Sequence, residues 1–76
     1  MGQVRDNKLL KKIALRIKEL RRLKNVSQEA VYFATDIHVA RIEQASVNVS
    51  VSTLAKLCNY FGITLADFFK EIWNLL

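Results

Sequence analysis

Two short helices joined by a tight corner are predicted between Ser27 and Glu43, and this segment constrains the fold most strongly. Ser27 is a residue type that caps helices, because its hydroxyl accepts a hydrogen bond from a free backbone N–H in the first turn. The capped helix extends to about residue 34. Thr35-Asp36 then forms the corner, since Asp tolerates a left-handed backbone. A second helix is expected over about residues 37–45, and the sequence leaves its start open between Ile37 and His38.

The rest of the chain also has apolar residues at helical spacing, and no alternation typical of a strand persists. The chain lacks Pro and has two Gly, so long helices meet few breakers. Helix ends are indicated by Asn7 or Asp6 and Lys24 for the first helix, Ser50 and Gly62 for the fourth, and Thr64 for the fifth.

These features predict an all-α fold, a compact five-helix bundle. Seventy-six residues suit one domain, and a hydrophobic content of 51% is ample for its core. We therefore expect residues 1–7 to form a flexible N-terminal arm and residues 8–76 to form a single domain.

Positive charge is concentrated at the N-terminal end. The net charge is +5, and residues 1–24 contain nine Lys and Arg but two acids. A basic end favours a polyanionic partner, whereas Lys and Arg on a helix also suit a solvated face. Lys8, Lys11 and Lys12 fit either a solvated face or contacts with flanking phosphates.

The composition argues against several other classes of protein. One cysteine cannot form an internal disulfide, which fits a reducing compartment, and no signal peptide or membrane span is expected. We expect a cytoplasmic protein. One His, one Cys and the absence of metal-ligand spacing or a Gly-rich loop predict no enzyme activity, no cofactor and no metal site.

Five short motifs occur in an order that resembles the phage-repressor type (Cro-like, XRE) helix-turn-helix family. The resemblance covers roughly residues 13–69 and implies a lambda-repressor-like DNA-binding domain that acts as a sequence-specific transcriptional regulator. The motifs are Arg16-Ile17-Lys18-Glu19-Leu20-Arg21, Val26-Ser27-Gln28-Glu29, Arg41-Ile42-Glu43, Ser50-Val51-Ser52-Thr53-Leu54 and the segment 61–69, FGITLADFF.

The resemblance implies roles for particular residues. Gln28 would contact a phosphate or support the recognition helix, and Arg21 would form a structural ion pair with Glu43. The chain departs from the family pattern in three respects. About three residues are missing between Gln28 and Glu43, Asp36 stands where Gly is common, and the loop 45–49 has no cation.

The expected DNA contacts lie on the helical pair and in the loop after it. Their roles remain open between base contact, phosphate contact and an ordinary surface position, with phosphate favoured for Arg41 and for Gln28 and Thr35 near the second helix. The candidate DNA-binding residues are Gln28, Thr35, His38, Arg41, Gln44 and Asn48.

The apolar C-terminal helix predicts an interface with another molecule, because a short chain has limited interior in which to bury it. Phe69, Ile72, Trp73 and Leu76 are the expected contacts of a homodimer, which would bind double-stranded DNA at a palindromic operator. The alternative is an antitoxin-like or protein-interaction module whose C-terminal helix docks on a partner protein.

Overall fold

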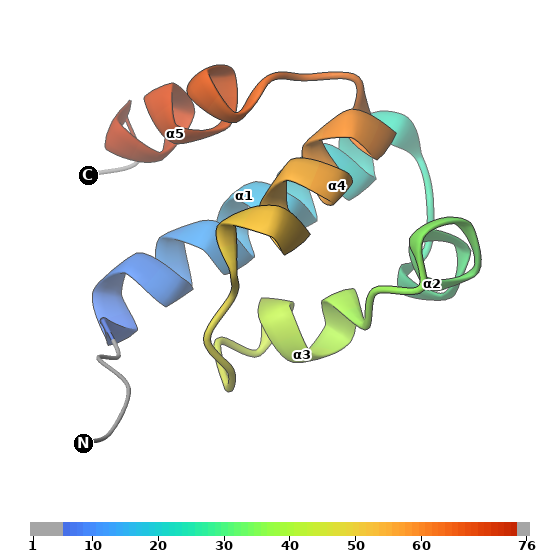
Figure 1. Ribbon diagram of the computed structural model, residues 1–76, viewed down its shortest axis with the longest axis horizontal. Coiled ribbons are helices and arrows are strands. Elements are labelled where there is room, and N and C mark those ends of the chain that lie inside the picture. The colour runs from blue at the N-terminus through green and yellow to red at the C-terminus, as the bar shows by residue number, and fades with distance from the viewer. Residues whose placement is uncertain (1–5, 75–76) are drawn as a thin grey trace.

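The computed structural model describes residues 6–74, with side chains described as far as Ile72. Within this part the chain is all-α, as predicted, and contains no strand. The five helices follow one another with short connections (Figure 1). They are α1 (Asn7–Lys24), α2 (Gln28–Thr35), α3 (Val39–Glu43), α4 (Val51–Phe61) and α5 (Leu65–Asn74).

Side-chain caps begin four of these helices. Ser27 Oγ accepts from the Ala30 N–H at 3.0 Å, and Ser50 Oγ accepts from the Thr53 N–H at 3.1 Å. Thr64 Oγ1 accepts from the Asp67 N–H at 3.0 Å and so caps α5. The first helix is capped by Asp6, so residues 6 and 7 of the expected arm belong to the start of α1, and residues 1–5 lie outside the described part.

Three helices end at a residue with a left-handed backbone. Asn25 closes α1 with φ 58°, Asp36 closes α2 with φ 62° and Gly62 closes α4 with φ 77°. This conformation lets backbone N–H groups after the helix bond to its last free carbonyls. Asp36 thus occupies a position at which Gly is usually favoured.

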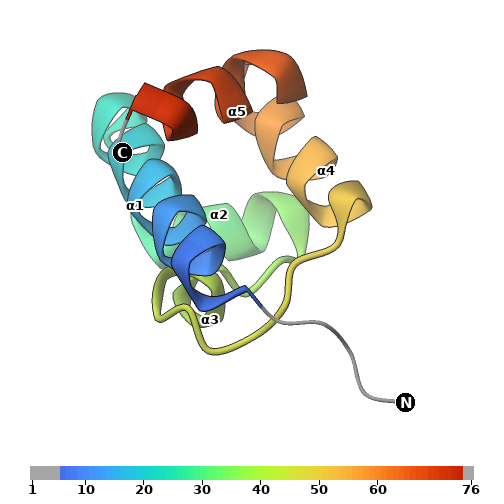
Figure 2. The same cartoon turned by 90° about the vertical axis from the view of Figure 1, so that its left-hand side faces the viewer.

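The core lies where all five helices meet. Figure 2 shows α5 and α3 at opposite ends of the view, with α1 and α4 on either side. The buried residues include at least one from each helix, and none of the described helices is long and apolar enough to cross a membrane. The central side chains are Ile17, Val31, Val39, Leu57, Phe68 and Ile72.

Helix α3 is shorter than the segment 37–45 that the sequence predicts. Its start is delayed because the Ile37 N–H is bound by the Thr35 hydroxyl at 3.2 Å and His38 has non-helical dihedral angles. Its end comes early because Ala45 has a left-handed φ of 55°. The recognition region is therefore a five-residue helix with a structured corner in front of it.

Substitutions at two of the left-handed residues, Gly62 and Asp36, should change the stability of the fold in opposite directions. Replacing Gly62 by Ala should cost about 1–2 kcal/mol, because a Cβ at φ 77° strains the backbone although no neighbour lies within 4 Å. Replacing Asp36 by Gly relieves the same strain and should gain up to about 1 kcal/mol. Urea unfolding followed by circular dichroism measures both. A Gly variant at position 36 that loses as much as the Ala variant at 62 would contradict this account.

Candidate nucleic-acid interface

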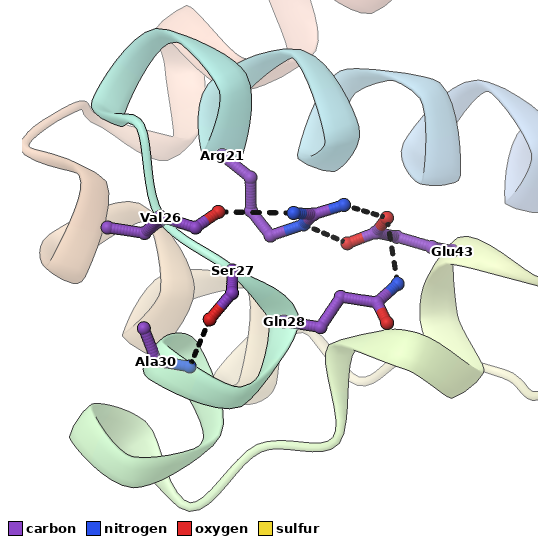
Figure 3. Close-up of polar contacts among 6 residues, drawn as sticks. All are labelled: Arg21, Val26, Ser27, Gln28, Ala30 and Glu43. Carbon is purple, nitrogen blue, oxygen red and sulfur yellow. Dashed lines mark hydrogen bonds and ion pairs between the residues drawn. The ribbon is translucent and has the colours of Figure 1, made fainter.

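A bidentate ion pair connects the first and third helices. Arg21 Nε donates to Glu43 Oε2 at 2.6 Å, and Arg21 Nη2 donates to Oε1 at 2.8 Å (Figure 3). The structure thus contains the pair that the family resemblance implies. Parallel bonds between a guanidinium and a carboxylate fix the orientation of both groups as well as their separation.

Two further hydrogen bonds connect this ion pair to the start of α2. Arg21 Nη1 donates to the Val26 carbonyl at 3.1 Å, and Gln28 Nε2 donates to Glu43 Oε1 at 3.2 Å (Figure 3). The N-terminus of α2 is therefore held against both α1 and α3. Gln28 thus contacts the end of α3, and its contact with DNA stays a prediction.

The two partners of the ion pair differ in exposure. The Glu43 side chain is 1% exposed and the Arg21 side chain is 21% exposed. The hydrogen bond to Glu43 raises the pKa of Arg21, desolvation opposes that effect, and the charge of Glu43 adds to it. The guanidinium consequently stays charged, and the buried carboxylate always has a cationic partner.

Three candidate DNA-binding residues are exposed along α3 and at its ends. His38 immediately precedes the helix, Arg41 lies within it and Gln44 closes it. Val39 and Ile42, on the other side of the helix, are buried in the core. The short helix therefore presents one polar, accessible side, which is what insertion into a groove of DNA requires.

Thr35 shapes the corner rather than presenting its hydroxyl to a ligand. The residue is 4% exposed, its Oγ1 donates to the Val31 carbonyl at 2.7 Å, and the same atom accepts from the Ile37 N–H. The phosphate contact expected of Thr35 conflicts with this geometry. Asn48, by contrast, is exposed in the loop that follows α3.

The corner carries an aromatic cluster that sequence reasoning did not assign to the site. Tyr32 stacks on His38 with ring centroids 4.4 Å apart, and the adjacent Phe33 is 82% exposed. These rings and Ala40 border a shallow hollow of about 210 Å³. The exposure of Phe33 could have been predicted from the sequence, because Phe33 follows the inward-facing Val31 by two residues and so lies on the opposite side of the helix.

The C-terminal helix contributes mainly to the core of one chain. Ile72 is 1% exposed, and Phe69 is partly buried against the core, so neither presents a full apolar surface to a second subunit. Ile72 is thereby corrected from a surface position to a core position. The side chains of Trp73 and Leu76 lie outside the described residues.

The described residues show neither a cluster of metal ligands nor an activated cysteine. Among the residues that the structure describes, no three His, Cys, Asp or Glu side chains gather as metal ligands would. Cys58 is buried, and its burial raises the pKa of the thiol, although the nearby charge of Arg16 acts in the opposite direction. Burial thus disfavours the thiolate that a nucleophile would need.

The unequal exposure of the ion pair predicts unequal mutational costs. Arg21→Ala leaves a buried carboxylate without its cation and should cost about 3–5 kcal/mol. Glu43→Ala should cost less, because the partly exposed guanidinium can turn towards water. Chemical denaturation of both variants tests the order. Equal losses, or a larger loss for Glu43→Ala, would contradict the order that the two exposures predict.

The exchanged double variant, Arg21→Glu with Glu43→Arg, provides the control. It should recover part of the lost stability because opposite charges face each other again. Recovery should be incomplete, since the Val26 carbonyl and the Gln28 amide are placed to bind the original groups.

Comparison with known protein families agrees with this geometry. Residues 17–68, more than half of the chain, match the family model described as Helix-turn-helix. No curated protein and no solved structure shows significant similarity to the chain. The matched segment begins within α1 and ends within α5, and so contains the ion pair, the corner and α3. The chain therefore belongs to the helix-turn-helix family of DNA-binding transcription regulators of the XRE, or phage-repressor, type.

Proposed function

We propose that this chain is a sequence-specific regulator that binds a palindromic DNA site as a homodimer, with α3 in the major groove. The observation that carries the proposal is the two-sided character of α3. Val39 and Ile42 anchor the helix in the core, whereas Arg41 and Gln44 face solvent. A helix anchored on one side and polar on the other can enter a groove without losing its support.

Arg41 is the strongest candidate for contact with a base or an adjacent phosphate. It is exposed at the centre of α3, and within the described part of the chain its guanidinium forms no ion pair. A guanidinium can donate two parallel hydrogen bonds to guanine or to a phosphate. His38 and Gln44 lie on either side of it and extend the same polar edge.

The N-terminus of α2 supplies the expected anchor on the DNA backbone. Its first N–H groups carry the positive end of the helix dipole, which favours a phosphate. Gln28 and Arg21 hold this end next to Glu43 at the end of α3. Backbone anchor and reading helix are thus fixed relative to each other before DNA binds.

The homodimer follows from the geometry of DNA rather than from an observed interface. Two copies of α3 that enter successive major grooves on one face of the duplex should lie roughly 34 Å apart. We propose that the C-terminal part of α5 joins the two copies, with Phe69 at its border. Trp73 and Leu76 remain the expected central contacts.

Selection of bound duplexes from a random pool, followed by gel-shift titration, tests the function. The selected site should be an inverted repeat with half-sites about one helical turn apart. A chain that shows no preference for any duplex at moderate salt would remove the proposal. A selected site with a single half would remove the homodimer but leave sequence-specific binding in place.

Arg41→Ala should weaken binding to the selected duplex by a factor of roughly 5 to 150, which corresponds to about 1–3 kcal/mol for a lost bidentate contact. Lys56→Ala is the control, because Lys56 is an exposed cation on α4. A loss of discrimination between selected and random duplexes would identify base contact, and a uniform loss would identify phosphate contact. Equal effects of the two variants would exclude Arg41 from the interface.

A second candidate function, binding of a protein partner, is favoured by a specific observation on α2 rather than on α5. Phe33 is 82% exposed beside the shallow hollow at the corner, and its ring lies against that of Tyr32, with centroids 6.0 Å apart, outside the cluster of buried core residues. Phe33→Ser should abolish a stoichiometric protein complex while leaving thermal stability unchanged. If such a complex persists in the variant, Phe33 is not its docking residue.

A further inference from the structure

The outer side of α1 carries three exposed cations in register. Lys11, Lys18 and Arg22 are separated by seven and four residues, close to two turns and one turn of helix, so they share one face. They extend over roughly 16 Å at 1.5 Å per residue. These three residues are named the α1 basic face.

The α1 basic face adjoins both ends of the candidate interface. Lys11 and Lys18 line a hollow of about 260 Å³ together with Gln44, at the end of α3. Lys18 and Arg22 line a second hollow, of about 630 Å³, together with Val26 in the connection before α2. The cations therefore border the groove-reading helix on one side and the phosphate-anchoring helix end on the other.

The acids that line these hollows are already paired with arginines. Glu19 borders the larger hollow and forms an ion pair with Arg16. Glu43 borders the smaller hollow and is held by Arg21. Among the residues described, Lys11, Lys18 and Arg22 therefore have no carboxylate partner in an ion pair, and the surface favours an anion.

The loop after α3 contains no cation, which makes the neighbouring α1 basic face the source of positive charge to consider. Residues 45–49, Ala-Ser-Val-Asn-Val, contain no Lys or Arg, so this loop supplies no cation to a DNA backbone beside α3. Protein affinity for DNA depends strongly on cations that neutralise phosphates. Cations on another element that borders the same helix can supply the phosphate contacts that this loop does not offer.

We propose that Lys11, Lys18 and Arg22 bind phosphates of the DNA backbone beside the groove that α3 enters, in place of the cation-free loop. This inference rests on the proposed DNA-binding function. The spacing of the three cations, over roughly 16 Å, matches several phosphates of one strand, which succeed one another every 3.4 Å along the duplex axis.

The dependence of binding on salt tests the proposal, with a variant of equal charge as the control. Lys18→Gln with Arg22→Gln removes two cations of the α1 basic face. Lys56→Gln with Lys70→Gln removes two exposed cations on α4 and α5. All four positions are exposed, and Gln is a good helix former, so both variants should fold and melt like the original chain.

For the α1 variant, the slope of log K against log salt concentration should become shallower by about 2, since each lost phosphate contact removes about 0.9. Its affinity for the selected duplex and for random duplex should fall by the same factor, because phosphate contacts carry no sequence information. Lys11→Gln alone should change the slope by about 1. The control variant should change it by much less.

Three results would overturn the inference, and each is distinct. Equal slope changes in the two double variants would indicate that the overall charge of the domain, and not direct phosphate contact by the α1 basic face, determines the salt dependence. If the α1 variant still binds its specific duplex and the slope of log K against log salt concentration is unchanged, the α1 basic face does not contact DNA. An acidic protein segment would then be the better candidate ligand for this face. Absence of any preferred duplex for the original chain would overturn the proposed function itself, and the inference with it.

Discussion

The buried carboxylate of Glu43 is the group on which the arrangement of the first three helices depends. A carboxylate that is 1% exposed requires compensation for its lost hydration, and here three side-chain donors provide it. Two belong to Arg21 of α1 and one to Gln28 of α2. Any relative shift of these helices lengthens a charge-assisted bond in a dry environment. The site is therefore held by an electrostatic requirement in addition to apolar packing.

The short third helix follows from what surrounds this carboxylate. The left-handed Ala45 ends α3 just after Glu43, and the Thr35 hydroxyl fixes the corner before the helix, so few residues remain for helix between them. Tyr32 and His38 stack where a longer helix would begin. The two rings border the shallow hollow at the corner.

The parts of the fold that depend on local chemistry were predictable from sequence. Ser27, Ser50 and Thr64 cap helices because a hydroxyl at that position satisfies a free N–H wherever the helix lies. The start of α3 was not predictable in this way. It depends on whether the Ile37 N–H bonds to the helix or to a side chain, and the apolar spacing is compatible with both.

The candidate site shows the same division between local and tertiary information. Exposure of Arg41 and Gln44 followed from the positions of Val39 and Ile42 on a helix. Burial of Thr35 and Ile72 did not, because a threonine at a corner and an isoleucine in an apolar stripe fit either a surface or a core. The arginine–glutamate pair was inferred through family resemblance, since no local pattern connects residues 21 and 43.

Positive and negative side chains are distributed unevenly over the domain. Glu19 and Glu43, which border the α1 basic face, are engaged by Arg16 and Arg21, whereas Glu29 lies in the first turn of α2 and Asp36 at the corner before α3. Beyond Lys24, acids outnumber Lys and Arg, five to three, and α5 carries two of those acids. A polyanion approaching the molecule is therefore attracted to the side of α1 and α3 more than to the side of α5. Under the proposed function, this asymmetry favours the approach of DNA from the side of α1 and α3.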